Sequence, residues 1–177
     1  MKILYLINHR PFFVSHRLPI ALKMQSDGHQ VYLLTGRSND TNMEKHAANQ
    51  LKKNEIKSKV LNFNSATTNL FKLIITFFYA YKFIKKLNPD LIHTASMKAI
   101  VLSGLCCLIL KKPIIIAFSG FGYLFTETRN IKTQSLKIII QFLLRIIFLN
   151  RKKHIIVQNK FDFNYLIKKF NLNEKDI

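Results

Sequence analysis

The sequence predicts an α/β domain of three layers, with a mostly parallel sheet of about six strands. Short apolar runs alternate with longer segments of helical periodicity along the 177 residues, which is typical of strands joined by crossover helices. The strand candidates are apolar on both faces, so helices are expected to cover both sides of the sheet. The length fits one domain, and a hydrophobic content of 49% excludes a disordered chain.

Three strands and three helices are expected before residue 88. Lys2–Ile7 is an apolar run cut off by Asn8-His9-Arg10-Pro11, which predicts a buried strand followed by a loop. Ser15 is placed to cap a helix through Gln25, and Gly28 follows where a C-cap glycine belongs. The next elements are strand Gln30–Thr35, helix Thr41–Lys53, strand Ile56–Phe63 and helix Thr67–Leu87. The last helix is closed by Asn88-Pro89, because a residue before proline resists the helical conformation.

The same alternation continues in the second half of the chain. The expected elements are strand Leu91–Thr94, helix Ser96–Leu110, strand Ile114–Phe118, helix Lys132–Asn150, strand His154–Val157 and helix Lys160–Phe170. Ser96 stands where it would cap the helix that it begins. Cys106 and Cys107 are adjacent within an apolar run, which favours two buried thiols in a reducing compartment over a disulfide or a metal site.

The charge predicts a polyanionic partner. Lys and Arg number 28 against nine acids, a formal net charge of +19, which favours nucleic acid, an anionic membrane or a phosphorylated substrate. No nucleic-acid-binding module is recognisable, so nucleic acid is not expected as a partner. Between Arg129 and Lys169 there are ten basic residues and one acid, beside helices too interrupted by polar residues to span a bilayer. This pattern favours peripheral attachment to anionic lipid, with a solvated charged face as the alternative.

Polar residues gather after the predicted strands, where open parallel sheets bind ligands. The segment from Asn8 to Arg17 combines two histidines, two arginines and a helix start, which suits a phosphate. A merely basic surface turn is the alternative reading. His93 lies at the end of the fourth predicted strand, where it is either a ligand contact or a structural histidine. Ser119-Gly120-Phe121-Gly122 follows the fifth strand. A full dinucleotide fingerprint and a P-loop are both missing from the sequence.

Several of these motifs, in this order, resemble a known family. They are Met1–His9 with Phe12–Pro19, Gly28–Val31, Asn88–His93, Gly120–Phe125 and Val157–Asn159. The chain resembles the N-terminal half of family 4 glycosyltransferases of the GT-B fold. Within that family it is similar to bacterial enzymes that extend polyprenyl-diphosphate-linked sugars for O-antigen, capsule or glycoprotein glycans.

The resemblance implies a Rossmann-like acceptor-binding domain over residues 1–177, with the C-terminal nucleotide-sugar domain expected to be absent. The implied function is acceptor binding in a retaining transfer from a nucleotide sugar to a polyprenyl-diphosphate-linked glycan, as in lipopolysaccharide or capsule biosynthesis. The implied substrate-binding residues are Asn8, His9, His16, Arg17, His93, Ser119, Gly120, Gly122, Gln158 and Asn159. No catalytic residue is assigned, because Ser119 stands where many members carry histidine.

The expected setting follows from the same resemblance. The chain is predicted to be cytoplasmic and peripheral on the inner face of the cytoplasmic membrane. No metal or cofactor is expected, because the nucleotide sugar is a co-substrate held mainly by the second domain. The chain alone is expected to bind acceptor without transferring sugar. The alternatives are a non-catalytic membrane-associated subunit that pairs with a separate donor-binding chain and, more weakly, a nucleic-acid-binding α/β domain.

Overall fold

The structure is a computed structural model that describes residues 1–64, 70–120 and 131–177. It contains a six-stranded sheet in the order β3-β2-β1-β4-β5-β6, and every pair of neighbouring strands is parallel. The strands are β1 (Lys2–His9), β2 (Gln30–Arg37), β3 (Lys57–Asn64), β4 (Leu91–Ala95), β5 (Ile114–Ala117) and β6 (Lys153–Ile156). The predicted α/β class, parallel sheet and strand number are therefore confirmed.

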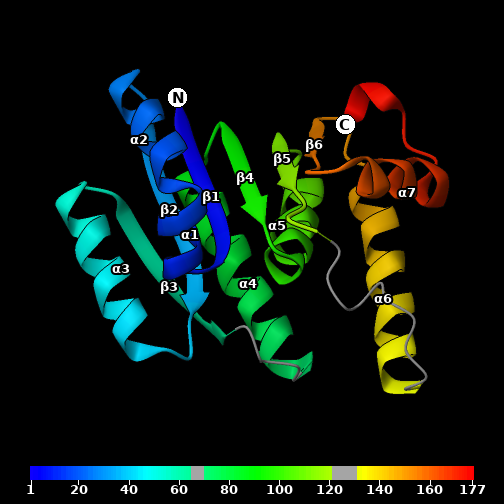
Figure 1. The fold of residues 1–177 in the computed structure, drawn as a ribbon, viewed down its shortest axis with the longest axis horizontal. Coiled ribbons are helices and arrows are strands. Elements are labelled where there is room, and N and C mark those ends of the chain that lie inside the picture. The colour runs from blue at the N-terminus through cyan, green and yellow to red at the C-terminus, as the bar shows by residue number, and fades with distance from the viewer. Residues whose placement is uncertain (65–69, 121–130) are drawn as a thin grey trace.

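Helices cover both faces of the sheet (Figure 1). One face carries α1 (Arg10–His16), α2 (Leu18–Ser26) and α3 (Thr41–Lys53), which enclose a core that includes Ile3, Tyr5 and Phe13. The other face carries α4 (Leu70–Leu87), α5 (Met97–Leu110) and α6 (Ile131–Ile147), over a core that includes Leu4 and Ile92. Alternate residues of β1 thus supply the two cores, as a strand buried on both faces requires.

The chain ends beside β6. Helix α7 (Lys160–Phe170) is followed by a short 3₁₀ helix, η2 (Glu174–Asp176). Asp176 Oδ2 lies 2.9 Å from Nζ of Lys153 on β6, whose side chain is only 9% exposed. This ion pair ties the last described turn to the edge strand of the sheet.

The first helix differs from its prediction. The sequence favoured a loop from Asn8 to a helix start at Ser15, whereas β1 continues to His9 and α1 begins at once at Arg10. Pro11 lies in the first turn of α1, where a missing N–H costs no hydrogen bond. The chain then breaks at Arg17 (φ −128°) before α2. Ser15 is no cap, because its hydroxyl donates to the Pro11 carbonyl at 2.9 Å.

Helix α5 is the central helix of its layer and approaches α6 closely. Among its buried residues are Gly104, Cys106 and Cys107, and burial raises the pKa of both thiols. A Cβ atom added at Gly104 would lie 2.6 Å from Cγ2 of Ile147, a residue of α6. Gly104 therefore sets the distance between the two helices, since any side chain there would overlap Ile147.

We expect Gly104→Ala to lower the free energy of unfolding. Overpacking a core costs about 1–3 kcal/mol, and the better helix propensity of alanine returns up to about 1 kcal/mol. The net loss of about 1 kcal/mol should lower the melting temperature by about 2–4 °C. In an Ile147→Ala background, which removes the overlap, the same substitution should instead stabilise. A Gly104→Ala protein more stable than the unaltered chain would contradict this packing.

Candidate functional site

The centre of the sheet contains a topological switch point. β1 and β4 are hydrogen-bonded neighbours, from Ile3 opposite Leu91 to Ile7 opposite Ala95. The chain leaves β1 into α1 on one face and leaves β4 into α5 on the other face. Open parallel sheets bind ligands at the carboxyl ends of the strands where the connections diverge in this way. The ends of β1 and β4 are therefore the candidate site.

The sheet register aligns polar residues along this edge. Asn8 follows Ile7 and Ser96 follows Ala95, so the two lie beside each other at the ends of β1 and β4. Their side-chain oxygens, Asn8 Oδ1 and Ser96 Oγ, are buried without a hydrogen-bond partner among the described residues. An unpaired buried polar group costs about 1–3 kcal/mol. The protein thus keeps two such costly groups at the ends of neighbouring strands, where a ligand is expected.

Ser96 combines this unpaired hydroxyl with a strained backbone. Its φ of 74° and ψ of 141° place a non-glycine residue in a conformation that L-residues rarely adopt. Ser96 is the N-cap of α5 by position, but its side chain makes no capping hydrogen bond, so the predicted cap is wrong. The first turn of α5 therefore receives no capping hydrogen bond from Ser96, and it contains Lys98 and no acid. A helix start of this kind favours an anion.

His93 lies opposite Tyr5 within β4, on the face of the sheet that carries α1 and α2. It is 8% exposed, its ring stacks on Tyr5 with centroids 5.0 Å apart, and its Nε2 has no hydrogen-bond partner in the described chain. Burial and, secondarily, the positive charge of Arg17 lower the pKa of His93 from 6.5 to about 4. The imidazole is therefore neutral at physiological pH.

Arg17 joins α1 to α2 and is half-buried. Its Nη1 donates to the His16 carbonyl at 3.0 Å, whereas its Nε has no partner among the described residues. Burial lowers the pKa of Arg17, and the neighbouring Tyr5 opposes that shift. The guanidinium thus lies near Tyr5 and His93 with one donor unused, which suits a hydrogen bond to an anionic oxygen.

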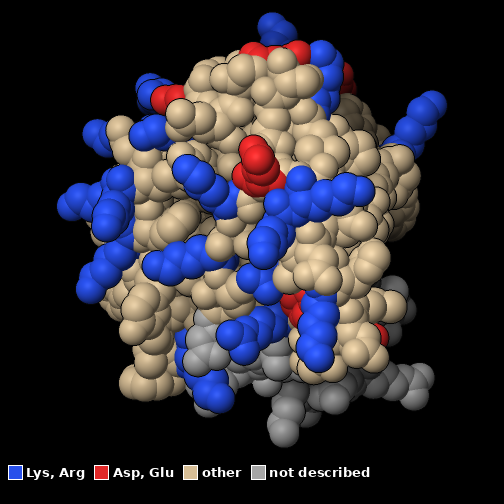
Figure 2. All heavy atoms as spheres, turned by 90° about the vertical axis from the view of Figure 1, so that its left-hand side faces the viewer, with Lys and Arg blue, Asp and Glu red and all other residues tan. Residues whose placement is uncertain are grey.

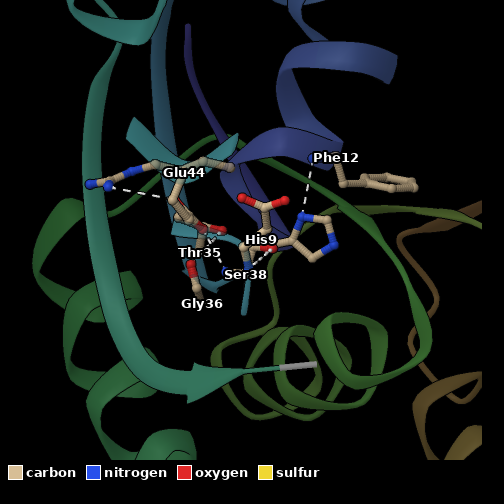
Figure 3. A network of polar contacts seen from close by, with 8 residues as sticks. His9, Phe12, Thr35, Gly36, Ser38 and Glu44 are labelled. Atoms are coloured by element: carbon tan, nitrogen blue, oxygen red, sulfur yellow. Dashed lines mark hydrogen bonds and ion pairs between the residues drawn. The ribbon is translucent and has the colours of Figure 1, made fainter. Parts of the chain in front are cut away.

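His9 and Glu44 meet at the ends of β1 and β2. His9 caps α1, because its Nδ1 accepts from the Phe12 N–H at 3.2 Å. Glu44 of α3 accepts from the Ser38 N–H at 2.6 Å and lies 3.7 Å from Nη1 of Arg10, and Figure 3 shows this network around the labelled residues. Burial lowers the pKa of His9, and Glu44 opposes that shift. Glu44 therefore holds the segment after β2 against the start of α1.

An aromatic surface extends from this network toward His16. The rings of Phe12 and His16 stack with centroids 4.5 Å apart and planes 11° apart. The Arg17 guanidinium lies 6.0 Å from the Phe12 ring centroid. His16 is exposed, so the shelf formed by Phe12 and His16 is accessible at the end of α1.

The remaining predicted residues follow β5 and β6. Ser119 and Gly120 are exposed, and Gly120 has a φ of 95° that favours glycine. Register places Ser119 beside Gln158, two positions beyond the pair of Ala117 and Ile156. Asn159 caps α7, with its Oδ1 accepting from the Asp162 N–H at 2.8 Å. Gly122 lies outside the described residues.

The structure thus brings some predicted residues together and separates others. Asn8, His9, Arg17 and His93 gather at the ends and inner face of β1 and β4, whereas Gln158 and Asn159 lie two strands away beyond β5. Ser96, Lys98 and Glu44 were not predicted as site residues. One sequence feature indicated Ser96 and Lys98, because both come soon after a predicted strand. No local pattern in the sequence relates Glu44 to His9. Within the described residues, no three His, Cys, Asp or Glu side chains are grouped to hold a metal ion.

Several solved structures of low sequence identity share this fold. MurG of Acinetobacter baumannii is 18% identical with a TM-score of 0.54, over 78% of this chain and 39% of that chain. A glycosyltransferase of Rickettsia africae is 17% identical with a TM-score of 0.61, over 99% of this chain and 41% of that chain. The UDP-GlcNAc 2-epimerase of Neisseria meningitidis, solved bound to UDP-GlcNAc, is 14% identical with a TM-score of 0.69. The match covers 99% of this chain and 44% of that chain. The chain therefore spans less than half the length of these three proteins.

The fold and the switch-point site define a Rossmann-like domain of the type found in GT-B glycosyltransferases. Comparison with curated proteins found no match. The sequence matches the Glycosyl transferase 4-like family over residues 2–159. The chain belongs to this family.

We expect the depressed pKa of His93 to make stability depend on pH. Between pH 6.5 and 4 the unfolded chain binds a proton that folded His93 excludes, so its contribution is complete above pH 6.5 and is lost as the pH falls toward 4. That loss is roughly 2–3 kcal/mol between pH 7 and 4.5. His93→Phe keeps a ring on Tyr5 without the ionisable group and should show a correspondingly smaller loss in urea unfolding.

The exposed His46 on α3 provides the control. His46→Gln should leave the pH dependence of the unaltered chain in place. Equal losses of stability in His93→Phe and the unaltered chain would show that His93 does not titrate as its burial requires.

Proposed function

We propose that this domain binds the acceptor for a retaining glycosyltransferase, which moves a sugar from a nucleotide sugar to a polyprenyl-diphosphate-linked glycan in cell-surface polysaccharide synthesis. The observation that carries the proposal is the set of buried, unpaired polar atoms at the switch point, on Asn8, Arg17, His93 and Ser96. Membership of the Glycosyl transferase 4-like family supports sugar transfer as the reaction class. A second domain or a separate chain supplies the nucleotide-sugar site.

The two parts of such an acceptor suit different parts of the site. The diphosphate is matched by the start of α5, where Ser96 makes no capping hydrogen bond and Lys98 adds a positive charge, and by the unused Nε donor of Arg17. The sugar is matched by uncharged groups, namely the amide of Asn8, the hydroxyl of Ser119 and the stacked rings of Phe12 and His16. Neutral His93 supports the floor of the site, where it accepts or donates one hydrogen bond without adding charge.

This arrangement prepares the acceptor rather than the donor. Transfer requires the acceptor hydroxyl to be held beside the anomeric carbon, and fixing two reactants in this way lowers a barrier by up to about 7–11 kcal/mol. The present site fixes one of the two reactants. We therefore propose that the described chain binds acceptor on its own and that turnover depends on the donor-binding domain.

A membrane surface is the second proposed partner, at the inner face of the cytoplasmic membrane. On α6, Ile138, Ile139 and Phe142 are 53–66% exposed, although the opposite side of the helix packs into the core. Within residues 1–64, 70–120 and 131–177, no helix is long and apolar enough to cross a bilayer. An exposed apolar stripe on a strongly basic protein supports binding parallel to an anionic lipid surface.

The acceptor proposal is tested by binding a short-chain polyprenyl-diphosphate sugar to the purified chain. Arg17→Ala removes a charge-assisted hydrogen bond worth about 1.5–3 kcal/mol, so affinity should fall about tenfold or more. Lys23→Ala, which removes an exposed cation on α2 that pairs with Asp27, should leave affinity unchanged. Calorimetry measures both. Unchanged affinity in Arg17→Ala would remove Arg17 from the site, and no binding by the unaltered chain would refute acceptor binding.

The membrane proposal is tested by flotation with liposomes. Ile138→Ser together with Phe142→Ser should reduce binding to anionic vesicles more than tenfold, because each fully buried side chain contributes about 1.5–3 kcal/mol. Binding of the unaltered chain should weaken as salt is raised. Ser135→Ala, an exposed polar position on the same helix, is the matched control. Equal binding to neutral and anionic vesicles would contradict the electrostatic part of the proposal.

A further inference from the structure

A groove lies between β3 and the first half of α4, away from the switch point. Its volume is about 620 Å³, within the range of sites that hold small molecules. The lining comes mainly from Lys59 and Leu61 on β3 and from Phe71, Ile75 and Tyr79 on α4. No residue of the groove belongs to the site described above.

The groove is mainly apolar, and the buried hydroxyl at its base already has a hydrogen-bond partner. Thr76 also lines it and is 3% exposed, but its hydroxyl already donates to the Lys72 carbonyl at 2.7 Å. Phe71 and Tyr79 remain 71% and 63% exposed, and Ile75 remains 42% exposed. Three large side chains with this much free surface along one helix face favour an apolar occupant.

The surroundings of the groove are basic. Lys59 and Lys72 line it, and no acid does. Lys57 lies on the same strand, and Lys82, Lys85 and Lys86 are exposed further along α4. Figure 2 shows the side of the molecule that carries α3 and β3, where Lys and Arg side chains gather across the surface. The occupant that complements both features is an apolar chain attached to an anionic head.

The groove lies within reach of the switch point. Only β2 separates β3 from β1, which corresponds to about 10 Å between the two strands. The residues of α4 that line the groove belong to its first half, and a crossover helix begins at the carboxyl edge of a parallel sheet. A ligand held at the ends of β1 and β4 therefore has a short path to the groove.

We propose that this groove binds the first segment of the lipid chain of the acceptor. Lys59 and Lys72 attract the attached diphosphate from the groove side, and the ring of Tyr79 with Ile75 and Phe71 covers the apolar chain. The proposal rests on the proposed function, because it assigns the lipid part of the same acceptor to a second surface of the domain. The domain would then recognise the lipid chain of the acceptor as well as its sugar and phosphates.

The test uses ligands without sugar and alters only residues in or near the groove, so that the residues of the switch-point site stay unchanged throughout. Calorimetry compares farnesyl diphosphate, a short polyprenyl diphosphate, with inorganic diphosphate. The unaltered chain should bind farnesyl diphosphate more tightly. Tyr79→Ala should weaken farnesyl diphosphate binding about fivefold or more and leave inorganic diphosphate binding unchanged.

Two matched variants distinguish the groove from general surface adsorption. Phe78 is 57% exposed on the same helix but does not line the groove, so Phe78→Ala should leave farnesyl diphosphate binding unchanged. Lys59→Ala should weaken that binding, and Lys57→Ala should not. Equal affinity for the two ligands, or equal losses in Tyr79→Ala and Phe78→Ala, would overturn the proposal. If the groove variants behave as expected while Arg17→Ala leaves binding of the sugar-bearing acceptor unchanged, the lipid groove stands and the acceptor site at the switch point fails.

Discussion

The parallel pairing of β1 with β4 determines where the other elements lie. β1 also pairs with β2, so the chain must travel from the edge strand β3 back to the centre of the sheet through α4. Helices before this crossover cover one face, and those after it cover the other. As a result, the helices that follow β1 and β4 diverge, and the polar ends of these two strands are left between them. The candidate site is thus a consequence of strand order before it is a consequence of any particular side chain.

The sequence predicted the inner strands β1, β2, β4 and β5 well because each is built around a short, largely apolar run, as burial on both faces requires. The first helix was predicted wrongly because Asn8 and Pro11 are typical of turns, although proline is equally suited to the first turn of a helix. Ser96 looked like an ordinary cap, and its positive φ and unpaired hydroxyl depend on the neighbouring strands. The proximity of Arg17 to His93 could not be predicted from local sequence patterns either, because it results from packing between elements that are distant in the sequence.

The few acids of the chain are largely used in holding local structure. Asp90 accepts from the Lys2 N–H at 2.7 Å, Asp40 caps α3, and Glu44 binds the segment after β2. In the described part of the chain only three acids form ion pairs, namely Asp27, Glu44 and Asp176. Most lysines and arginines are therefore not neutralised by a neighbouring carboxylate. Folding alone gains nothing from this repulsion, so the excess of positive charge supports the proposal of an anionic partner.

The exposed apolar residues lead to the same conclusion by a separate route. On α4 they lie mainly in the first half of the helix, at Phe71 to Tyr79, and on α6 they lie around its middle, at Leu136 to Phe142. Helices that join parallel strands begin at the carboxyl edge of the sheet, so the exposed residues of α4 lie toward the edge that carries the switch point. A protein with polar residues at these positions would fold equally well, because the buried sides of the helices already form the core. The apolar surface of α4 and the unpaired polar atoms therefore lie toward one edge of a strongly basic domain, and the proposed acceptor, a lipid-linked anion that carries a sugar, is a single ligand that would complement all three features.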